Sequence, residues 1–291
     1  MKKSKGLKPN IIEINTFNQD PFKGDLKKEF FKIFPRIVQG IQKARKIYKA
    51  EIKNLKEEIL SAPKELWDEI VEQAKKLSID LIGFTAVDDS FIFTNDQSTG
   101  ISQLYNNGIM LGMEMKYDRI DQAPGPQAGL EAFRVYADLG IATNELADYI
   151  RSKGYGAIAC HPVGGPILYP AMAVKAGLGE IGRQGLLITK EFGPRQRLSM
   201  IATNASPLPE TVKEEFKISE YCQKCRKCIL TCPGKAIYEE PLMNENGTVT
   251  RINSDKCFEY FYETTGCSVC IQTCPFHKLG YNKIFKLRGY S

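Results

Sequence analysis

Eight of the nine cysteines lie in the last quarter of the chain, between Cys222 and Cys274. The first four follow the spacing Cys-x2-Cys-x2-Cys-x3-Cys-Pro, which is the run found in bacterial ferredoxins. A second copy reads Cys-x2-Cys-x3-Cys-Pro, and Cys257 upstream supplies its first member. Thiolates at these spacings can close three corners of an iron–sulfur cubane. The fourth cysteine, which precedes the proline, then reaches the other cluster.

The spacing therefore predicts two [4Fe–4S] clusters that exchange their fourth ligands. Two structural zinc sites are the alternative, because paired CxxC motifs also bind zinc. Two copies that each end in Cys-Pro favour iron–sulfur clusters, and the stretched interval between Cys257 and Cys267 predicts an inserted loop beside the second cluster. The predicted ligand sets are Cys222, Cys225, Cys228 and Cys274 for one cluster, and Cys232, Cys257, Cys267 and Cys270 for the other.

Two neighbouring clusters form a one-electron relay, and a relay needs an acceptor. As many as 221 residues precede Cys222, which is far more than a ferredoxin module uses. We therefore expect the preceding part of the chain to hold a redox centre or a small-molecule substrate.

The composition is that of a globular protein that does not enter a membrane. The chain has 291 residues, of which 43% are hydrophobic and 25% charged, with a net charge of +6. The mild basic excess is typical of solvated helix faces, so we expect no nucleic-acid partner. No run approaches the roughly 18 apolar residues of a membrane helix. The basic N-terminal stretch has neither an apolar run nor a twin arginine, so we expect a cytoplasmic protein.

Strands that alternate with helices along the chain predict an α/β layer whose sheet is at least partly parallel. A helical pattern interrupted by Pro35 covers residues 26–76, and a further helix begins at Pro63. The other predicted helices are 129–154 and 168–176, and the predicted strands are 79–87, 107–115, 155–160, 184–189 and 197–205. The predicted domains are an N-terminal helical extension (1–78), an α/β core (79–209) and a ferredoxin-like domain (210–291).

The segment Gly177-x-Gly179-x-x-Gly182 has the glycine spacing of a dinucleotide-binding fingerprint. That fingerprint must follow a strand, open a helix, and have an acidic residue about 20 positions later. Here a predicted helix precedes the glycines, a predicted strand follows them, and "RLSMIATN" carries no carboxylate. The context excludes NAD or FAD binding. It leaves a turn in which the glycines allow close backbone approach, to packed protein or to a large planar cofactor.

The segment "AVKAGLGEIGRQGLLITKEFGPRQRLSMIATNASPLP", followed by two ferredoxin motifs, resembles the corrinoid and iron–sulfur reductive dehalogenases. The segments "GIMLGMEMKYDRIDQAPG" and "YADLGIATNELADYIRSKGYGAIAC" are also similar to that family, whose superfamily includes epoxyqueuosine reductase. The resemblance implies a nitroreductase-like α/β core that binds base-off cobalamin. It also implies that the clusters pass electrons to cobalt, which removes halide from an organohalide.

The resemblance also suggests site residues. Tyr136 matches the family's proton donor and Arg195 the cation beside the halide, although Tyr136 could equally be a core residue and Arg195 an ordinary surface residue. His161 follows a predicted strand, where it could contact the corrin or substrate or make a structural hydrogen bond. The remaining residues expected to contact the corrin are Gly177, Gly179, Gly182 and Arg183.

Two other functions stay open. One is a cobalamin-free electron-transfer protein of the same fold. The other is tRNA modification like that of epoxyqueuosine reductase, which the loop "HPVGGPILYP" disfavours because it lacks the carboxylate expected there. The expected partners are a small-molecule substrate and a low-potential electron donor such as ferredoxin or flavodoxin, and the chain could form a homodimer.

Overall fold

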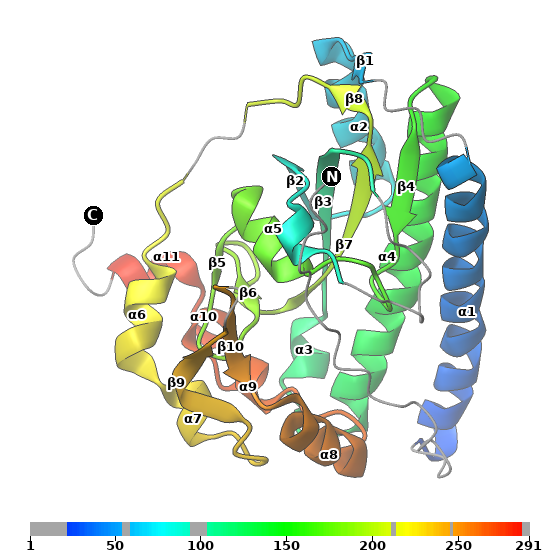
Figure 1. The fold of residues 1–291 in the computed structure, drawn as a ribbon. Helices are drawn as coiled ribbons and strands as arrows, with labels where there is room; N and C mark the ends of the chain where they lie inside the picture. Colours follow the sequence, from blue (N-terminus) through cyan, green and yellow to red (C-terminus); the bar gives the residue numbers. More distant parts are fainter. Residues whose placement is uncertain (1–21, 54–58, 94–103, 211–213, 245–246, 287–291) are drawn as a thin grey trace.

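The computed structural model describes residues 22–53, 59–93, 104–210, 214–244 and 247–286 (Figure 1). The sequence predicts an extended segment over about the first 25 residues, which contain Pro9 and Pro21, and most of that segment lies outside these residues. Part of the segment 85–130, on which the shape of the predicted halide pocket depends, also lies outside them. Among the described residues, no helix is both long enough and apolar enough to cross a membrane.

A four-stranded sheet with the order β2-β3-β7-β4 forms the centre of the core. Every neighbouring pair in this sheet is antiparallel, so the prediction of partly parallel pairing was wrong for it. The helix between β3 and β4 does connect two strands of the same direction, as predicted, but β7 lies between them. The strands are β2 (Leu81–Ala86), β3 (Asn107–Glu114), β4 (Ala157–Cys160) and β7 (Gln196–Thr203).

Both faces of the sheet are covered, which explains the nearly continuous apolar runs of its strands. Ile109 and Leu111 of β3 pack into one cluster with α2 and α4, whereas Met110 packs into a second cluster with α5. The alternation follows from the two-residue period of a strand. Helix α1 lies alongside α4 (Figure 1). These helices are α1 (Gly24–Lys53), α2 (Lys64–Lys76), α4 (Pro126–Ser152) and α5 (Tyr169–Lys175).

Helix α1 runs without a break through Pro35, so the predicted interruption was wrong. Pro35 is exposed, and the carbonyl that loses its amide partner there can be hydrated. The other long elements agree with the prediction. Helix α2 begins after Pro63, and α4 ends before Gly154, whose φ of +90° suits the position after a helix.

The glycine segment lies between helix α5 and a two-stranded antiparallel ribbon of β5 (Glu180–Ile181) and β6 (Leu187–Ile188). The predicted order of helix then strand is confirmed, and it is the reverse of the order that a dinucleotide-binding fingerprint requires. A short parallel pair joins β1 (Leu60–Ser61) to β8 (Ala205–Ser206), and the helical turn α3 (Tyr117–Ile120) follows β3.

The C-terminal elements form a module beside the core (Figure 1). Short helices carry five of the eight cysteines. The prediction of an inserted loop between Cys257 and Cys267 was wrong, because most of that interval belongs to helix α8 (Ser254–Thr264). An antiparallel hairpin, β9 (Ile237–Met243) with β10 (Val249–Ile252), lies instead between Cys232 and Cys257. The helices are α6 (Ile218–Cys225), α7 (Lys227–Leu230), α8 (Ser254–Thr264), α9 (Val269–Gln272), α10 (Pro275–Lys278) and α11 (Tyr281–Lys286).

Candidate iron–sulfur and substrate site

The two cysteine motifs are structural repeats as well as sequence repeats. Arg226 follows Cys225 with φ +53°, and Ser268 follows Cys267 with φ +50°. Each of these left-handed residues begins a four-residue helix, α7 or α9, whose second residue is the next cysteine. The shared turn fixes the direction of successive thiols, so the repeated spacing produces a repeated geometry.

The thiols fall into two groups that agree with the predicted ligand sets. Cys222 and Cys274 interact electrostatically with each other and with Cys228, and Cys222 also does so with Cys225. Cys257 and Cys270 interact with each other and with Cys267 and Cys232, and Cys270 also interacts with Cys228 of the first group. Cys274 thus lies with the first motif and Cys232 with the second, as the predicted exchange requires, and ligation of clusters by these two sets stays a prediction.

Burial dominates the chemistry of these thiols. It raises the pKa of Cys222 and of Cys274 to about 12, and it raises the pKa of Cys270 well above its usual range. Iron–sulfur ligation requires thiolates, so cluster assembly must displace these protons. No three Cys, His, Asp or Glu side chains of the described residues form a group able to hold a single metal ion. A four-iron cluster is wider than one ion, so its thiolates need not meet at single-ion distances.

The glycine segment packs tightly against its own ribbon. A Cβ on Gly179 would lie 2.1 Å from the Ile188 carbonyl oxygen, and one on Gly182 would lie 2.4 Å from Gln184 Oε1. Gly177 has φ +74° and Gly179 φ +154°. Internal packing therefore accounts for these glycines, and their contact with a corrin stays a prediction.

Arg183, next in sequence, lies beside the first thiol group. Its main-chain N–H hydrogen-bonds the Cys222 sulfur, and its guanidinium acts electrostatically on Cys228. The guanidinium also donates to the Glu239 carbonyl oxygen of β9.

Arg195 is buried and joins the core to the C-terminal module. Its guanidinium donates to Glu114 Oε1 at 2.5 Å and to the Met115 carbonyl oxygen at 3.0 Å. It also contacts His277 Nδ1 at 3.2 Å, and the His277 ring stacks on Tyr117 at 4.4 Å. With its donors used in this way, Arg195 has the contacts of a structural anchor, and its role as a halide-site cation stays a prediction.

Tyr136 lies with a different arginine from the one expected. The Arg197 guanidinium stands 4.8 Å from the centre of the Tyr136 ring. Arg197 pairs with Met113 across β3 and β7, so both side chains belong to the face of the sheet that α4 covers. The sequence left Arg197 open as an ordinary residue on a strand edge, because no local signal links it to Tyr136, 61 residues earlier.

His161 is wedged between helices α1 and α4. A Cβ on Gly140 would lie 2.1 Å from His161 Nε2, and one on Gly40 would lie 2.9 Å from it. His161 Nδ1 accepts a hydrogen bond from the Val163 amide at 3.1 Å, and burial lowers the pKa of His161 to about 4. The structure thus places a neutral imidazole at a helix crossing, and its contact with a cofactor stays a prediction.

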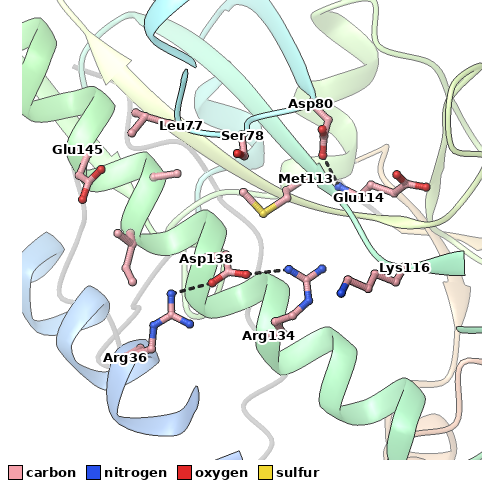
Figure 2. Close-up of a pocket in the computed structure, with 12 residues that line it drawn as sticks. Arg36, Leu77, Ser78, Asp80, Met113, Glu114, Lys116, Arg134, Asp138 and Glu145 are labelled. Atoms are coloured by element: carbon pink, nitrogen blue, oxygen red, sulfur yellow. Dashed lines mark hydrogen bonds and ion pairs between the residues drawn. The ribbon is translucent and has the colours of Figure 1, made fainter. Parts of the chain in front are cut away.

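A cavity of about 490 Å³ lies between α1, α4 and the end of β3, and Figure 2 shows the residues that line it. Asp138 accepts hydrogen bonds from Arg36 and Arg134, both at 2.7 Å. Asp80 accepts from the Glu114 amide at 2.8 Å. Because Glu114 also binds Arg195, a polar path leads from this cavity to His277, three residues after Cys274. The volume of the cavity suits a small-molecule ligand.

Comparison with known proteins identifies the C-terminal module. Residues 221–278 match the model of the 4Fe-4S dicluster domain. This finding supports iron–sulfur clusters over zinc and confirms a ferredoxin-like dicluster domain at this end of the chain.

The similarity to curated proteins extends into the core. The chain is 35% identical over 193 residues to tetrachloroethene reductive dehalogenase of Sulfurospirillum multivorans, an alignment covering 63% of this chain and 38% of that protein. It is 27% identical over 274 residues to epoxyqueuosine reductase of Lactococcus garvieae, covering 76% of this chain and 72% of that one. The chain thus spans little more than a third of the dehalogenases it matches.

Solved structures agree about the fold. A catabolic reductive dehalogenase superposes with a TM-score of 0.71 at 19% identity, covering 87% of this chain and 38% of that one. An epoxyqueuosine reductase in complex with a tRNA stem loop superposes with a TM-score of 0.52 at 18% identity, covering 75% and 66%. The resemblance to this superfamily and the α/β fold class are confirmed. The relatives of this chain, in sequence and in fold, are therefore the reductive dehalogenases and the epoxyqueuosine reductases.

Proposed function

We propose that this iron–sulfur oxidoreductase is a cobalamin-dependent reductive dehalogenase that acts on a small organohalide. Its two [4Fe–4S] clusters would accept electrons singly from a low-potential ferredoxin or flavodoxin. The reaction consumes two electrons and one proton, breaks the carbon–halogen bond, forms a carbon–hydrogen bond and releases halide. The strongest support is the 35% identity to a tetrachloroethene reductive dehalogenase, and one structural neighbour is described in terms of B12-dependent dehalogenation.

Polar atoms in the core fit a cobalamin. Gln184 Nε2, Gln196 Oε1 and Arg197 Nε are buried and have no hydrogen-bond partner among the described residues. Gln196 donates to the Leu187 carbonyl oxygen at 2.8 Å, so the start of β7 adjoins the glycine ribbon. Buried polar atoms without partners are costly, and the amide groups around a corrin could satisfy both donors and acceptors. We therefore propose that these three residues hold the cofactor.

When bound, cobalamin would supply the metal centre that accepts the electrons and attacks the organohalide. In this proposal Tyr136 Oη holds the proton that replaces the halogen. Arg197 above the ring favours the negative charge that remains when the proton leaves. Arg195 and Glu114 fix the position of the cavity wall relative to the second cysteine motif.

The test is anaerobic reconstitution with iron, sulfide and cobalamin. We expect one tightly bound cobalamin per chain and a change in its visible spectrum. A triple variant Q184L/Q196L/R197L should bind cobalamin at least tenfold more weakly, whereas E145Q, at the rim of the cavity, should bind it like the parent. If the parent chain fails to bind cobalamin at saturating concentration, the proposal is refuted and the cobalamin-free electron-transfer alternative is favoured.

The alignment with epoxyqueuosine reductase supports a second candidate function, because it covers 72% of that protein. The loop before the glycine segment carries no carboxylate between His161 and Pro170. Expression in a strain that lacks its own reductase tests this candidate: restored queuosine in tRNA would establish it, and no restoration would remove it. Cell fractionation and sizing would test the proposed cytoplasmic location and the proposed homodimer.

A further inference from the structure

Two arginines from different elements meet beside one of the two thiol groups. Arg183 follows the glycine segment, and Arg251 lies in β10. A Cβ on Gly185 would lie 3.7 Å from the Arg251 Cβ, which brings the ribbon and the hairpin into contact. Burial lowers the pKa of Arg251, and the charge of Arg183 lowers it further, whereas Cys222 raises it. The two cations and the first thiol group therefore share one environment.

Arg183 approaches this thiol group with both its main chain and its side chain. Its amide N–H hydrogen-bonds the Cys222 sulfur. The side chain is only 15% exposed, with Glu240 at 3.9 Å, and it donates to the Glu239 carbonyl oxygen. The Nε atom is buried and lacks a hydrogen-bond partner in the described part of the chain. A cluster at this position would offer sulfide or thiolate acceptors to that donor.

The second thiol group has a different electrostatic environment. The charged neighbours that perturb Cys257, Cys267 and Cys270 are other cysteines. Glu180 is the carboxylate that acts on Cys222, and it also accepts a hydrogen bond from the Ser219 amide at 2.6 Å. Glu240, 3.9 Å from Arg183, is 89% exposed, so water screens its charge. The two guanidinium groups therefore outweigh Glu180, and the net charge beside the first group is positive.

We propose that Arg183, supported by Arg251, makes the cluster of the first cysteine group more easily reduced than the other cluster. Reduction adds one electron to a cluster, and nearby positive charge stabilises the added negative charge. Hydrogen bonds to cluster sulfurs shift the reduction potential in addition. The inference rests on the iron–sulfur part of the proposed function and does not require cobalamin.

A spectroscopic redox titration of the reconstituted chain without cobalamin tests the inference. The parent should titrate in two one-electron steps. In R183Q, the step at higher potential should move down by at least a tenfold change in its equilibrium constant, which is about 59 mV for one electron. The double variant R183Q/R251Q should move the same step further, and the step at lower potential should stay in place.

Lys43 provides the control, because it carries the same charge and pairs with the exposed Asp148, and it lies on α1 outside the C-terminal module. K43Q should leave both steps within error of the parent. In a C267A background, which removes the second cluster, the R183Q shift should persist. Equal movement of both steps, or no movement in R183Q/R251Q with the fold intact by circular dichroism, would overturn the inference. Failure of cobalamin binding would leave the titration result unchanged, so the two proposals fail separately.

Discussion

The contact between Gly129 of α4 and the turn before Cys267 provides the sharpest structural prediction. A Cβ on Gly129 would lie 2.2 Å from the Thr265 carbonyl oxygen and 3.1 Å from the Gly266 Cα. The Gly125 amide also donates to the Gly266 carbonyl oxygen at 2.8 Å. Helix α4 therefore fixes the position of the loop that carries Cys267, a predicted ligand of the second cluster, and G129A should displace that loop.

The magnitude follows from two opposing effects. Alanine in place of glycine inside a helix ordinarily stabilises by about 0.5–1 kcal/mol. Overpacking against backbone atoms that cannot rotate away costs about 1–3 kcal/mol. The clash is with a main-chain carbonyl, so we expect overpacking to prevail and G129A to lower the free energy of unfolding by about 1–2 kcal/mol.

The assay combines urea unfolding of the apoprotein with iron and sulfide analysis after reconstitution. G129A should lose iron selectively, toward the content of a single four-iron cluster. G140A is the matched control, because Gly140 lies on the same helix. Its added Cβ would lie 2.1 Å from His161 Nε2, and His161 is far in sequence from every predicted cluster cysteine. G140A should be destabilised but keep full iron. Parental stability and iron in G129A, or equal iron loss in both variants, would refute the reasoning.

Three further outcomes are expected. Y136F should lower dehalogenation turnover by about 10²–10⁴-fold, the range for loss of a general acid, with cobalamin affinity unchanged; unchanged turnover would exclude Tyr136 as the donor. R195Q should lower the free energy of unfolding by about 2 kcal/mol, because its partner Glu114 is 36% exposed and can be rehydrated; a loss near zero in urea unfolding would contradict its anchoring role. Burial lowers the pKa of His161 to about 4, so as the pH falls the unfolded chain takes up a proton on His161 at a higher pH than the folded chain does. The free energy of unfolding should therefore fall as the pH drops from about 6.5 toward 4. H161N keeps an acceptor for the Val163 amide and should weaken this pH dependence. An H161N profile identical to that of the parent would show that His161 does not cause the pH dependence.

Most individual elements were predictable because their signals are local. The helix from Pro63 and the long helix ending before Gly154 depend on capping and periodicity within one segment. The strand pairing was not predictable, because the alternation of strands with helices does not reveal that β7, from a later segment, lies between β3 and β4. The continuous helix through Pro35 also escaped prediction, since tolerance of that proline depends on its exposure to water.

The candidate site divides in the same way. The spacing of cysteines within a few residues constrains the thiols directly, so the sequence alone indicated a dicluster domain and the exchange of Cys232 and Cys274. Tertiary structure decided which distant residues meet: Arg197 rather than Arg195 with Tyr136, Arg195 with His277, and Arg183 with Cys222. Those contacts join segments tens of residues apart, and their geometry depends on how the helices and the sheet pack together.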